Sequence, residues 1–226
     1  MYLNYFKFLF VLLCGAATAC SVVESSSKRN AAVPTPTPTA VIAAAPTPKG
    51  EQTAVFAGGC FWGLEAVFEH VKGVSNVTSG YSGGEAKTAN YDAVGTGETG
   101  HAEAVKITFD SSKVSYEQLL KVFFAVAHDP TELNRQGPDT GTQYRSAIFY
   151  ANDEQKRIAK SFIDKLTADK VFAKPIVTQI VALENYYQAE DYHQDYLVQH
   201  PNQPYIVVND KPKVENLRKQ FPDLYQ

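Results

Sequence analysis

Apolar residues along the chain alternate between the period of a strand and the period of a helix. A short apolar run at 53–57 ends in two glycines and predicts a buried strand. Four apolar residues then recur at helical spacing: Leu64, Val67, Phe68 and Val71. We therefore expect a helix of about three turns that begins near Cys60 and stops at Gly73.

The next segment predicts a loop-rich stretch and then a half-buried strand. Residues 74–101 are rich in Gly, Ser and Thr, so they should hold one weak strand and a long loop. Along 101–109, apolar residues alternate with polar ones, at Val105, Ile107 and Phe109. Glu103 has the same parity as these apolar residues, so its carboxyl group should lie on the buried face of the strand.

The second half of the chain continues to mix helices and strands. Ser115 and Gln118 predict a capping box for a helix that ends at Asp129-Pro130. The remaining expected elements are a helix capped by Asn152 that runs to about Ala168, strands at 144–150 and 176–183, a polar Tyr-rich helix at 186–200 and a short helix from about Val214. This pattern predicts an α+β domain, with a small mixed β-sheet and helices packed on it. We expect it to be a two-layer sandwich with a ferredoxin-like core.

The N-terminus has the pattern of an export signal. No charge occurs from Phe8 to Val23, and these 16 residues are fewer than the ~20 that a membrane-spanning helix needs. Lys7 precedes the apolar run and small residues end at Ala19, as in a bacterial secretory signal. Cys20 follows directly, and this arrangement resembles a bacterial lipoprotein signal at 1–20 that ends at a lipidated Cys20. The alternative is a plain secretory signal cut near Ala19.

Residues 21–50 predict a disordered tether between this signal and one folded domain at 51–226. The tether holds five of the chain's 12 prolines, is dominated by Pro, Ser, Thr and Ala, and has no aromatic residue. We expect an exported protein of the cell envelope, anchored to a membrane by its lipid and facing the periplasm or the cell surface. The formal net charge of −3 and the pI of about 6.0 argue against a nucleic-acid partner.

Cys60 is a candidate nucleophile. The chain has 3 cysteines, which excludes a disulfide-rich scaffold and a four-cysteine metal site. Cys60 falls where a strand turns into a helix, so the helix dipole and free backbone N–H groups should favour its thiolate. Gly59 and Gly63 leave space around it for a substrate. A buried structural cysteine is the alternative reading.

Two further features suggest chemistry near Cys60. A carboxyl group on the buried face of a strand should have a raised pKa, so Glu103 would suit the role of a general acid. The alternative is a frayed strand end with a solvated Glu103. Phe61 and Trp62 would form an apolar socket for a small group such as a methyl, or would simply pack in the core.

Several blocks of the sequence, in this order, resemble the peptide methionine sulfoxide reductase A family. They are GCFWG at 59–63, TGHAEAV at 99–105, HDPT at 128–131, NRQG at 134–137, Asp139, GTQYRSAI at 141–148 and EDYHQ at 190–194. The resemblance covers about 53–225. It implies an enzyme that reduces the S epimer of methionine sulfoxide, free or in oxidised proteins, with no bound cofactor or metal.

The resemblance also implies roles for individual residues. Cys60 would attack the sulfoxide sulfur and Glu103 would protonate the oxygen, which leaves Cys60 as a sulfenic acid. The other implied roles are hydrogen bonds to the oxygen from Tyr91 and Tyr144, ordering of the site by Asp129, and a methyl pocket formed by Phe61 and Trp62.

The chain departs from many members of this family because no cysteine follows Cys60. Many members resolve the sulfenic acid with a second cysteine near the C-terminus, and Gly95 stands where some members carry a cysteine. We therefore expect an external reductant: a thioredoxin-like or glutaredoxin-like protein, or a small thiol. A second hypothesis uses Cys20 as the resolving thiol, which lipidation of Cys20 would exclude. We expect the protein to be a monomer.

Other polar residues receive structural interpretations. No pair of histidines has the spacing of a helical zinc site, so no metal is expected at His101, His128 or His193. Arg145 is expected to pair with a carboxylate. Three rival functions stay open: a cysteine hydrolase that uses Cys60 with a histidine, a thiol peroxidase, and a non-enzymatic lipoprotein with a vestigial site.

Overall fold

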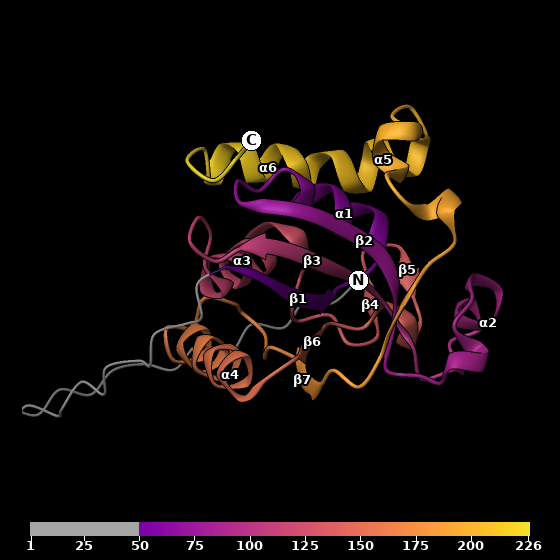
Figure 1. Ribbon diagram of the computed structural model, residues 1–226, viewed down its shortest axis with the longest axis horizontal. Coiled ribbons are helices and arrows are strands. Elements are labelled where there is room, and N and C mark those ends of the chain that lie inside the picture. The colour runs from indigo at the N-terminus through magenta and orange to yellow at the C-terminus, as the bar shows by residue number, and fades with distance from the viewer. Residues whose placement is uncertain (1–49) are drawn as a thin grey trace, which may run out of the picture. The chain divides into compact units, whose positions relative to one another are not determined.

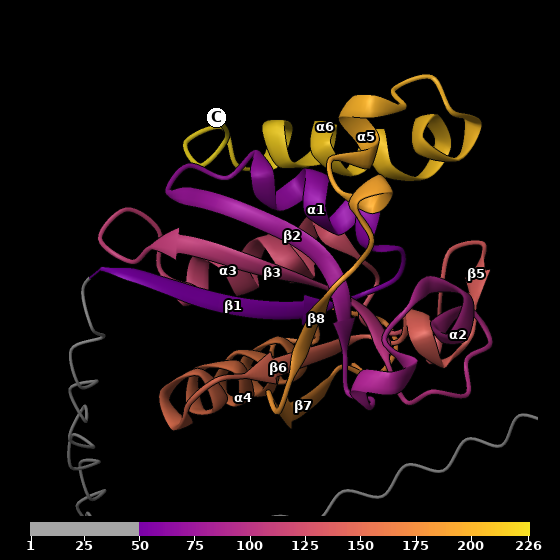
Figure 2. The same cartoon turned by 45° about the vertical axis from the view of Figure 1, so that its right-hand side comes forward.

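The computed structural model describes residues 50–226, so the predicted signal, Cys20 and the tether lie outside the described residues. Within that part, six strands form one sheet in the order β7-β6-β1-β3-β2-β8 (Figures 1 and 2). Their bounds are β1 Glu51–Ala57, β2 Val74–Ser82, β3 Ala102–Asp110, β6 Ala147–Tyr150, β7 Gln179–Ala182 and β8 Tyr186–Gln188. Neighbouring strands are antiparallel except β6 and β7, which are parallel, so the predicted mixed sheet is confirmed.

The sheet is curled, because its two edge strands are joined by a very short link. Three residues, 183–185, separate β7 from β8 (Figure 2). An extended chain of that length spans at most about 15 Å, whereas the edges of a flat six-stranded sheet lie about 24 Å apart. Leu183, from the link, and Tyr186 pack on a small apolar cluster on one face of the sheet. This cluster consists of Val55, Ala57, Ala102, Ala104, Ala147 and Phe149.

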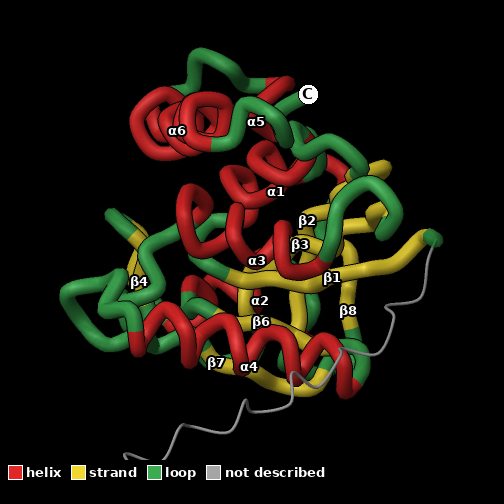
Figure 3. The backbone as a smooth tube through the Cα atoms, turned by 90° about the vertical axis from the view of Figure 1, so that its left-hand side faces the viewer, coloured by secondary structure: helices red, strands yellow, loops and turns green. Residues whose placement is uncertain are grey.

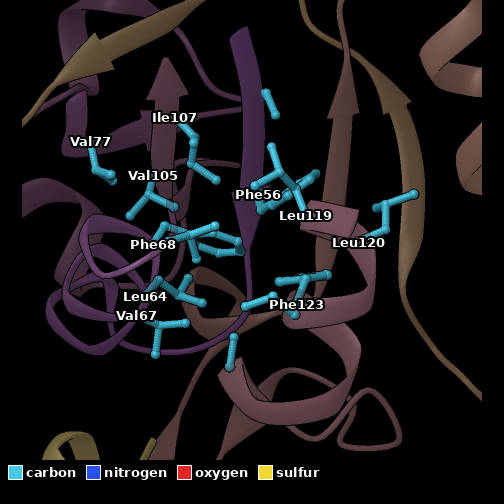
Figure 4. Packing of buried hydrophobic residues seen from close by; sticks show 14 of the residues in the cluster. Phe56, Leu64, Val67, Phe68, Val77, Val105, Ile107, Leu119, Leu120 and Phe123 are labelled. Carbon is cyan, nitrogen blue, oxygen red and sulfur yellow. The ribbon is translucent and has the colours of Figure 1, made fainter. Parts of the chain in front are cut away.

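The main core lies on the opposite face of the sheet, under α1 (Phe61–Glu69) and α3 (Tyr116–Val122). Figure 4 shows Phe56 of β1 with Val105 and Ile107 of β3. These side chains face Leu64 and Phe68 of α1 and Leu119 of α3. The alternate residues predicted along 101–109 are all fully buried there. This packing confirms the predicted register of β3, and that register determines which way Glu103 points.

The two predicted helix caps are both present. The Ser115 hydroxyl accepts a hydrogen bond from the Gln118 N–H at 3.1 Å, and the Gln118 side chain accepts one from the Ser115 N–H at 2.9 Å. The helix α3 continues through a π-helical turn, Phe123–Ala127. The Asn152 side chain accepts from the Gln155 N–H at 2.9 Å and caps α4 (Asp153–Ala168), which lies beside β6 and β7 (Figure 3).

The predicted helix at 186–200 is wrong. The segment instead forms β8, a 3-10 turn at Asp191–His193 and the short helix α5 (Tyr196–Gln199). Tyr187 pairs with Tyr81 of β2, since aromatic side chains suit a pleated, half-buried surface. Asp195 then adopts a left-handed backbone with φ of 52°, which separates α5 from the turn before it.

The stretch 74–101 is more ordered than its composition predicts. It contains the nine-residue strand β2, a 3-10 turn at Ala86–Thr88 and the short helix α2 (Tyr91–Gly95). A glycine in β2 permits close approach of β8: a Cβ on Gly80 would lie 2.3 Å from the Tyr187 carbonyl oxygen. Gly80 is therefore needed for the close contact between β2 and β8, whereas the glycine-rich composition of the segment predicts mostly loop.

The C-terminal segment adds helices outside the two predicted layers. A π-helical turn, Ile206–Asp210, leads into α6 (Lys211–Gln220), which packs along α1 (Figure 1). A small hairpin of β4 (Arg135–Gln136) and β5 (Asp139–Thr140) precedes a 3-10 turn at Thr142–Tyr144. Between residues 50 and 226, every helix is too short or too polar to cross a bilayer.

Candidate active site

A pocket of about 190 Å³ lies at the N-terminal end of α1 and is lined by residues from distant parts of the chain. Six of them are residues singled out from the sequence: Cys60, Phe61, Trp62, Tyr91, Glu103 and Tyr144. Three further lining residues were missed: Asp139, Gln203 and Tyr205. The pocket thus brings together Cys60, Glu103 and both tyrosines, as predicted, but the contribution of the C-terminal segment is not predicted.

Cys60 is held at the junction of β1 and α1 by a tight turn. It is the N-cap residue of α1 and is 7 % exposed. Gly59 has φ of 92°, a conformation that favours glycine, and a Cβ there would lie 2.6 Å from the Gln136 Cβ. The turn between strand and helix thus depends on Gly59 and directs the next residue, Cys60, toward the pocket.

The resting charge of Cys60 differs from the expectation. Burial raises the pKa of the Cys60 thiol well above its ordinary value, and the nearby carboxyl groups of Glu103 and Asp210 raise it further. The backbone N–H of Trp62, at the helix N-terminus, lowers this pKa but does not outweigh the burial. In the substrate-free site Cys60 is therefore a thiol, because desolvation exceeds the effect of the helix end.

Glu103 is buried beside the cysteine, so the alternative of a solvated side chain is wrong. It is 3 % exposed, and its Oε2 atom accepts a hydrogen bond from the Phe61 N–H at 3.0 Å. Burial raises the pKa of Glu103 to about 8, and this single hydrogen bond opposes the rise only in part. At neutral pH the side chain is protonated, which is the form that a general acid requires.

Tyr91 and Tyr144 place two phenol groups in the same pocket. Burial raises the pKa of Tyr91 to about 12 and that of Tyr144 above its ordinary value, so both hydroxyl groups keep their protons. The backbone N–H of Tyr91 donates to the Glu190 Oε1 at 2.9 Å, which ties α2 to the segment after β8. Two neutral donors therefore line the pocket beside a neutral acid.

The two rings that follow Cys60 have different environments. Phe61 is fully buried and packs at 5.9 Å from the Tyr81 ring, so core packing also describes it. Trp62 is half-buried and stacks on Tyr196, with ring centroids 3.7 Å apart and planes 5° from parallel. The Trp62 Nε1–H donates to the Nδ1 of His193 at 3.1 Å, which fixes the indole at the pocket wall.

The prediction for Asp129 is corrected by the geometry. Asp129 is exposed and outside the pocket, because its Oδ1 atom turns to accept from the Thr131 N–H at 2.9 Å and hydroxyl at 2.7 Å. The pocket carboxylate is Asp139, which accepts a hydrogen bond from the Tyr205 hydroxyl. Asp139 lies among the sequence blocks that carry the resemblance, whereas nothing in the local sequence singles out Tyr205, 66 residues later.

His101, His128 and His193, the histidines weighed as possible bases, lie outside the pocket lining. His101 accepts a hydrogen bond from the Gly84 N–H at 3.2 Å and bonds the Glu85 carbonyl at 3.0 Å. His128 bonds the Phe123 carbonyl at 3.0 Å and the Ser146 hydroxyl at 2.7 Å, and burial lowers its pKa to about 4. Because both ring nitrogens of each are engaged in structural bonds, neither can serve Cys60 as a base.

Arg145 does not pair with a carboxylate as expected. Its guanidinium group donates to three backbone carbonyls, those of Gly100, His101 and Thr142, at 2.8, 3.0 and 2.9 Å. The side chain thus joins the start of β3 to the turn that carries Tyr144. Within residues 50–226, no group of three or more His, Cys, Asp or Glu side chains is arranged to hold a metal ion.

Comparisons with known proteins agree on one family. The family described as peptide methionine sulfoxide reductase matches residues 52–225. A Mesorhizobium japonicum protein described as peptide methionine sulfoxide reductase MsrA 2 is 61 % identical over 176 residues, which are 78 % of this chain and 90 % of that protein. The solved methionine sulfoxide reductase A of Corynebacterium diphtheriae superimposes with a TM-score of 0.60 at 35 % identity, covering 75 % of this chain and 84 % of that one. The chain therefore belongs to the peptide methionine sulfoxide reductase A family and is a peptide-methionine (S)-S-oxide reductase.

Proposed function

We propose that Cys60 attacks the sulfoxide sulfur while Glu103 protonates the sulfoxide oxygen. The observation that carries this proposal is the shared pocket, in which a lone thiol faces a carboxyl group with a pKa of about 8. The S–O bond breaks and the oxygen passes to Cys60, so the substrate sulfur is reduced by two electrons and the cysteine is oxidised to a sulfenic acid. Glu103 regains a proton from the thiol, and methionine leaves.

The hydroxyl groups of Tyr91 and Tyr144 hydrogen-bond the sulfoxide oxygen in this proposal. Both phenols stay protonated near neutral pH, so each can donate to an oxygen that gains negative charge as the S–O bond lengthens. Asp139 accepts a hydrogen bond from Tyr205, and this bond orders the part of the pocket lining that these two residues form. Phe61 and Trp62 receive the substrate methyl group, because they supply the large apolar surfaces of the pocket.

We infer that an external thiol returns Cys60 to its reduced form. No cysteine follows Cys60 in the chain, so the folded domain holds no second thiol for an internal disulfide. One thiol would attack the Cys60 sulfenic acid and release water, and a second would break the mixed disulfide. A thioredoxin-like protein, a glutaredoxin-like protein and a small thiol are all of the chemical class required, with no bound cofactor.

We further propose that the protein repairs oxidised methionine in cell-envelope proteins as a lipid-anchored monomer. The signal pattern at 1–20, which ends at Cys20, and the proline-rich tether at 21–50 support this location. Intact mass of the mature protein tests it: diacylglycerol on the new N-terminal Cys20 supports the anchor. An unmodified N-terminus would overturn it, and a Cys20–Cys60 disulfide after one turnover would overturn the external-thiol route.

We also infer a ferredoxin-like connectivity for the centre of the sheet. The order β6-β1-β3-β2, with α1 between β1 and β2 and α3 between β3 and β6, supports this inference. In that arrangement each helix is a crossover that returns to the same face of the sheet, where both pack in one core.

The experiment that tests the enzyme mechanism uses the two sulfoxide epimers of a blocked methionine with dithiothreitol as reductant. The wild-type chain should consume the S epimer alone, and Cys60→Ser should consume neither. Cys20→Ser is the matched control and should keep its activity. Full activity of Cys60→Ser would overturn the assignment of the nucleophile.

A further inference from the structure

The C-terminal segment brings a charged pair to the first turn of α1. Asp210 ends the π-helical turn at Ile206–Asp210, and Lys213 follows one turn later in α6. The Lys213 Nζ atom donates to the Asp210 Oδ1 at 3.2 Å. The Asp210 side chain is 0 % exposed and the Lys213 side chain 18 %, which distinguishes this pair from the exposed ion pairs on the same surface.

The pair occupies space that a glycine of the active-site helix leaves free. A Cβ on Gly63 would lie 2.1 Å from the Asp210 Oδ1 and 2.8 Å from the Lys213 Nζ. Gly63 is in the first turn of α1, three residues after Cys60. Because Gly63 has no side chain, both charged groups can lie against the first turn of α1, which follows Cys60.

Packing alone does not explain this arrangement. Burying two charges costs free energy because it removes their hydration. Their mutual attraction offsets this cost only when the remaining polar atoms of the pair are also hydrogen-bonded. The Asp210 Oδ2 atom is buried and has no hydrogen-bond partner among residues 50–226. A buried pair with an unsatisfied oxygen is a poor stabilising device, so its position beside Cys60 calls for another role.

The charges around Cys60 indicate that role. The other ionisable groups of the pocket are acids or phenols: Glu103 from β3, Asp139 from β5, Tyr91 from α2, Tyr144, and Tyr205. No Lys or Arg from residues 50–226 lines the pocket itself. Burial raises the pKa of the Cys60 thiol most, Glu103 and then Asp210 raise it further, and Lys213 lowers it by less than Asp210 raises it. Lys213 thus supplies positive charge to a site whose other charged side chains are acidic.

We propose that Asp210 and Lys213 are positioning residues through which the C-terminal segment controls the charge of Cys60. Lys213 is the counter-ion of the thiolate that develops as Cys60 attacks, and the buried carboxylate of Asp210 opposes that effect with its own negative charge. The inference rests on the proposed role of Cys60 as nucleophile. It gives the C-terminal segment a part in the chemistry of a chain that has no resolving cysteine there.

The experiment measures how fast iodoacetamide alkylates Cys60 in the full chain, quantified on the Cys60 peptide by mass spectrometry. Below the pKa of the thiol, this rate follows the thiolate fraction, so a pKa shift of one unit changes it about tenfold. We expect Lys213→Met to slow alkylation about tenfold at fixed pH, and Asp210→Asn to speed it by a similar factor. Lys213→Arg should stay near wild type.

Two matched controls accompany these variants. Glu215→Gln and Arg218→Met remove an exposed i,i+3 ion pair on the same helix, and neither should change the alkylation rate. Should Lys213→Met fail to fold, the comparison of Asp210→Asn with Asp210→Asn/Lys213→Met isolates the lysine charge in a pair without a buried carboxylate. The double variant should then react about tenfold more slowly than Asp210→Asn.

The opposite signs distinguish a charge effect from loose packing. A purely structural pair would expose Cys60 in both single variants and speed alkylation in both. That outcome, or unchanged rates in folded variants, would overturn the inference. The proposed mechanism is tested separately, by the loss of epimer reduction in Cys60→Ser. Each of the two proposals can therefore fail while the other is supported.

Discussion

The Phe61 N–H donates to the Glu103 Oε2 at 3.0 Å and so joins the residue after the cysteine to the buried acid. The two residues lie 42 positions apart, one on the first turn of α1 and the other on β3. The bond fixes the acid relative to the nucleophile before any substrate arrives. Preorganisation of this kind avoids a reorganisation step at the moment of reaction.

Glu103→Gln should abolish most of the activity while leaving the site assembled. The amide oxygen can still accept from the Phe61 N–H, but the side chain has no acidic proton to donate. We expect kcat/KM for the S epimer to fall by about 10²–10³-fold, the range of a lost general acid. Glu98→Gln, at an exposed position, is the control. Near wild-type turnover in Glu103→Gln would assign the proton to another donor.

Asp139→Asn and Asp129→Asn should show which of the two carboxylates contributes to activity. Asp139 lies in the pocket and accepts from Tyr205, so its amide should weaken that bond and lower kcat/KM by about tenfold. Asp129 is exposed and bonds only Thr131 with its carboxylate, so Asp129→Asn should keep nearly full activity. Steady-state kinetics with the S epimer decide between them. A loss of activity in Asp129→Asn, with full activity in Asp139→Asn, would mean that Asp129 and not Asp139 orders the site.

Local signals predicted the parts of this site that lie within one element. The alternation along 101–109 is enough to predict that Glu103 is buried, and the strand–helix junction is enough to single out Cys60 as a candidate nucleophile. The capping box of α3 was likewise readable, because its two residues are three apart. In each case the signal and the structure it predicts depend on neighbours in the sequence.

Long-range pairing decides the rest of the fold and the site, and local sequence patterns do not predict it. Tyr186 and Tyr187 read as part of a polar helix, yet β2 provides an edge that makes them a strand. The pKa of the Cys60 thiol is raised, against the expectation from the helix end, because burial outweighs that end and the charges of Glu103 and Asp210, which come from distant elements, add to the rise. Tyr205 reaches Asp139 across 66 residues, a contact that no local pattern encodes.

His193→Ala tests the rival hypothesis of a cysteine hydrolase. His193 accepts from the Trp62 Nε1–H and is buried, so its loss should loosen the indole at the pocket wall. We expect KM for the S epimer to rise severalfold, with kcat within about threefold of wild type, because a binding surface is disturbed and no proton donor is lost. Loss of kcat in His193→Ala, without unfolding by circular dichroism, would favour a catalytic histidine.

Peroxide reactivity tests the rival hypothesis of a thiol peroxidase. Burial raises the pKa of the Cys60 thiol well above its ordinary value, and the thiol form is a weak nucleophile toward peroxide. Hydrogen peroxide should therefore form the Cys60 sulfenic acid more slowly than an equal concentration of the S epimer does. Trapping with dimedone and mass spectrometry measures both rates, with Cys60→Ser as the blank. Faster oxidation by peroxide would favour the peroxidase.

Glu65→Gln should stabilise the protein at alkaline pH and not at acidic pH. Glu65 is 1 % exposed, its Oε2 has no partner among residues 50–226, and burial raises its pKa from 4.5 to about 7. The folded state therefore binds more protons than the unfolded state between these values, and stability falls as pH rises through about 7. Below pH 4.5 the carboxyl group is neutral in both states, so this loss is absent there.

The measurement is the melting temperature of Glu65→Gln relative to wild type at pH 5 and pH 8. We expect the difference to grow by a few degrees toward pH 8, since each kcal/mol shifts the melting temperature of a domain this size by about 2–4 °C. Glu69, whose pKa burial raises to about 8, lies one helical turn away and contributes in the same direction in both proteins. Glu98→Gln, at an exposed position, should show no such trend. A stabilisation of Glu65→Gln that is equal at both pH values would mean that Glu65 is not neutralised by folding.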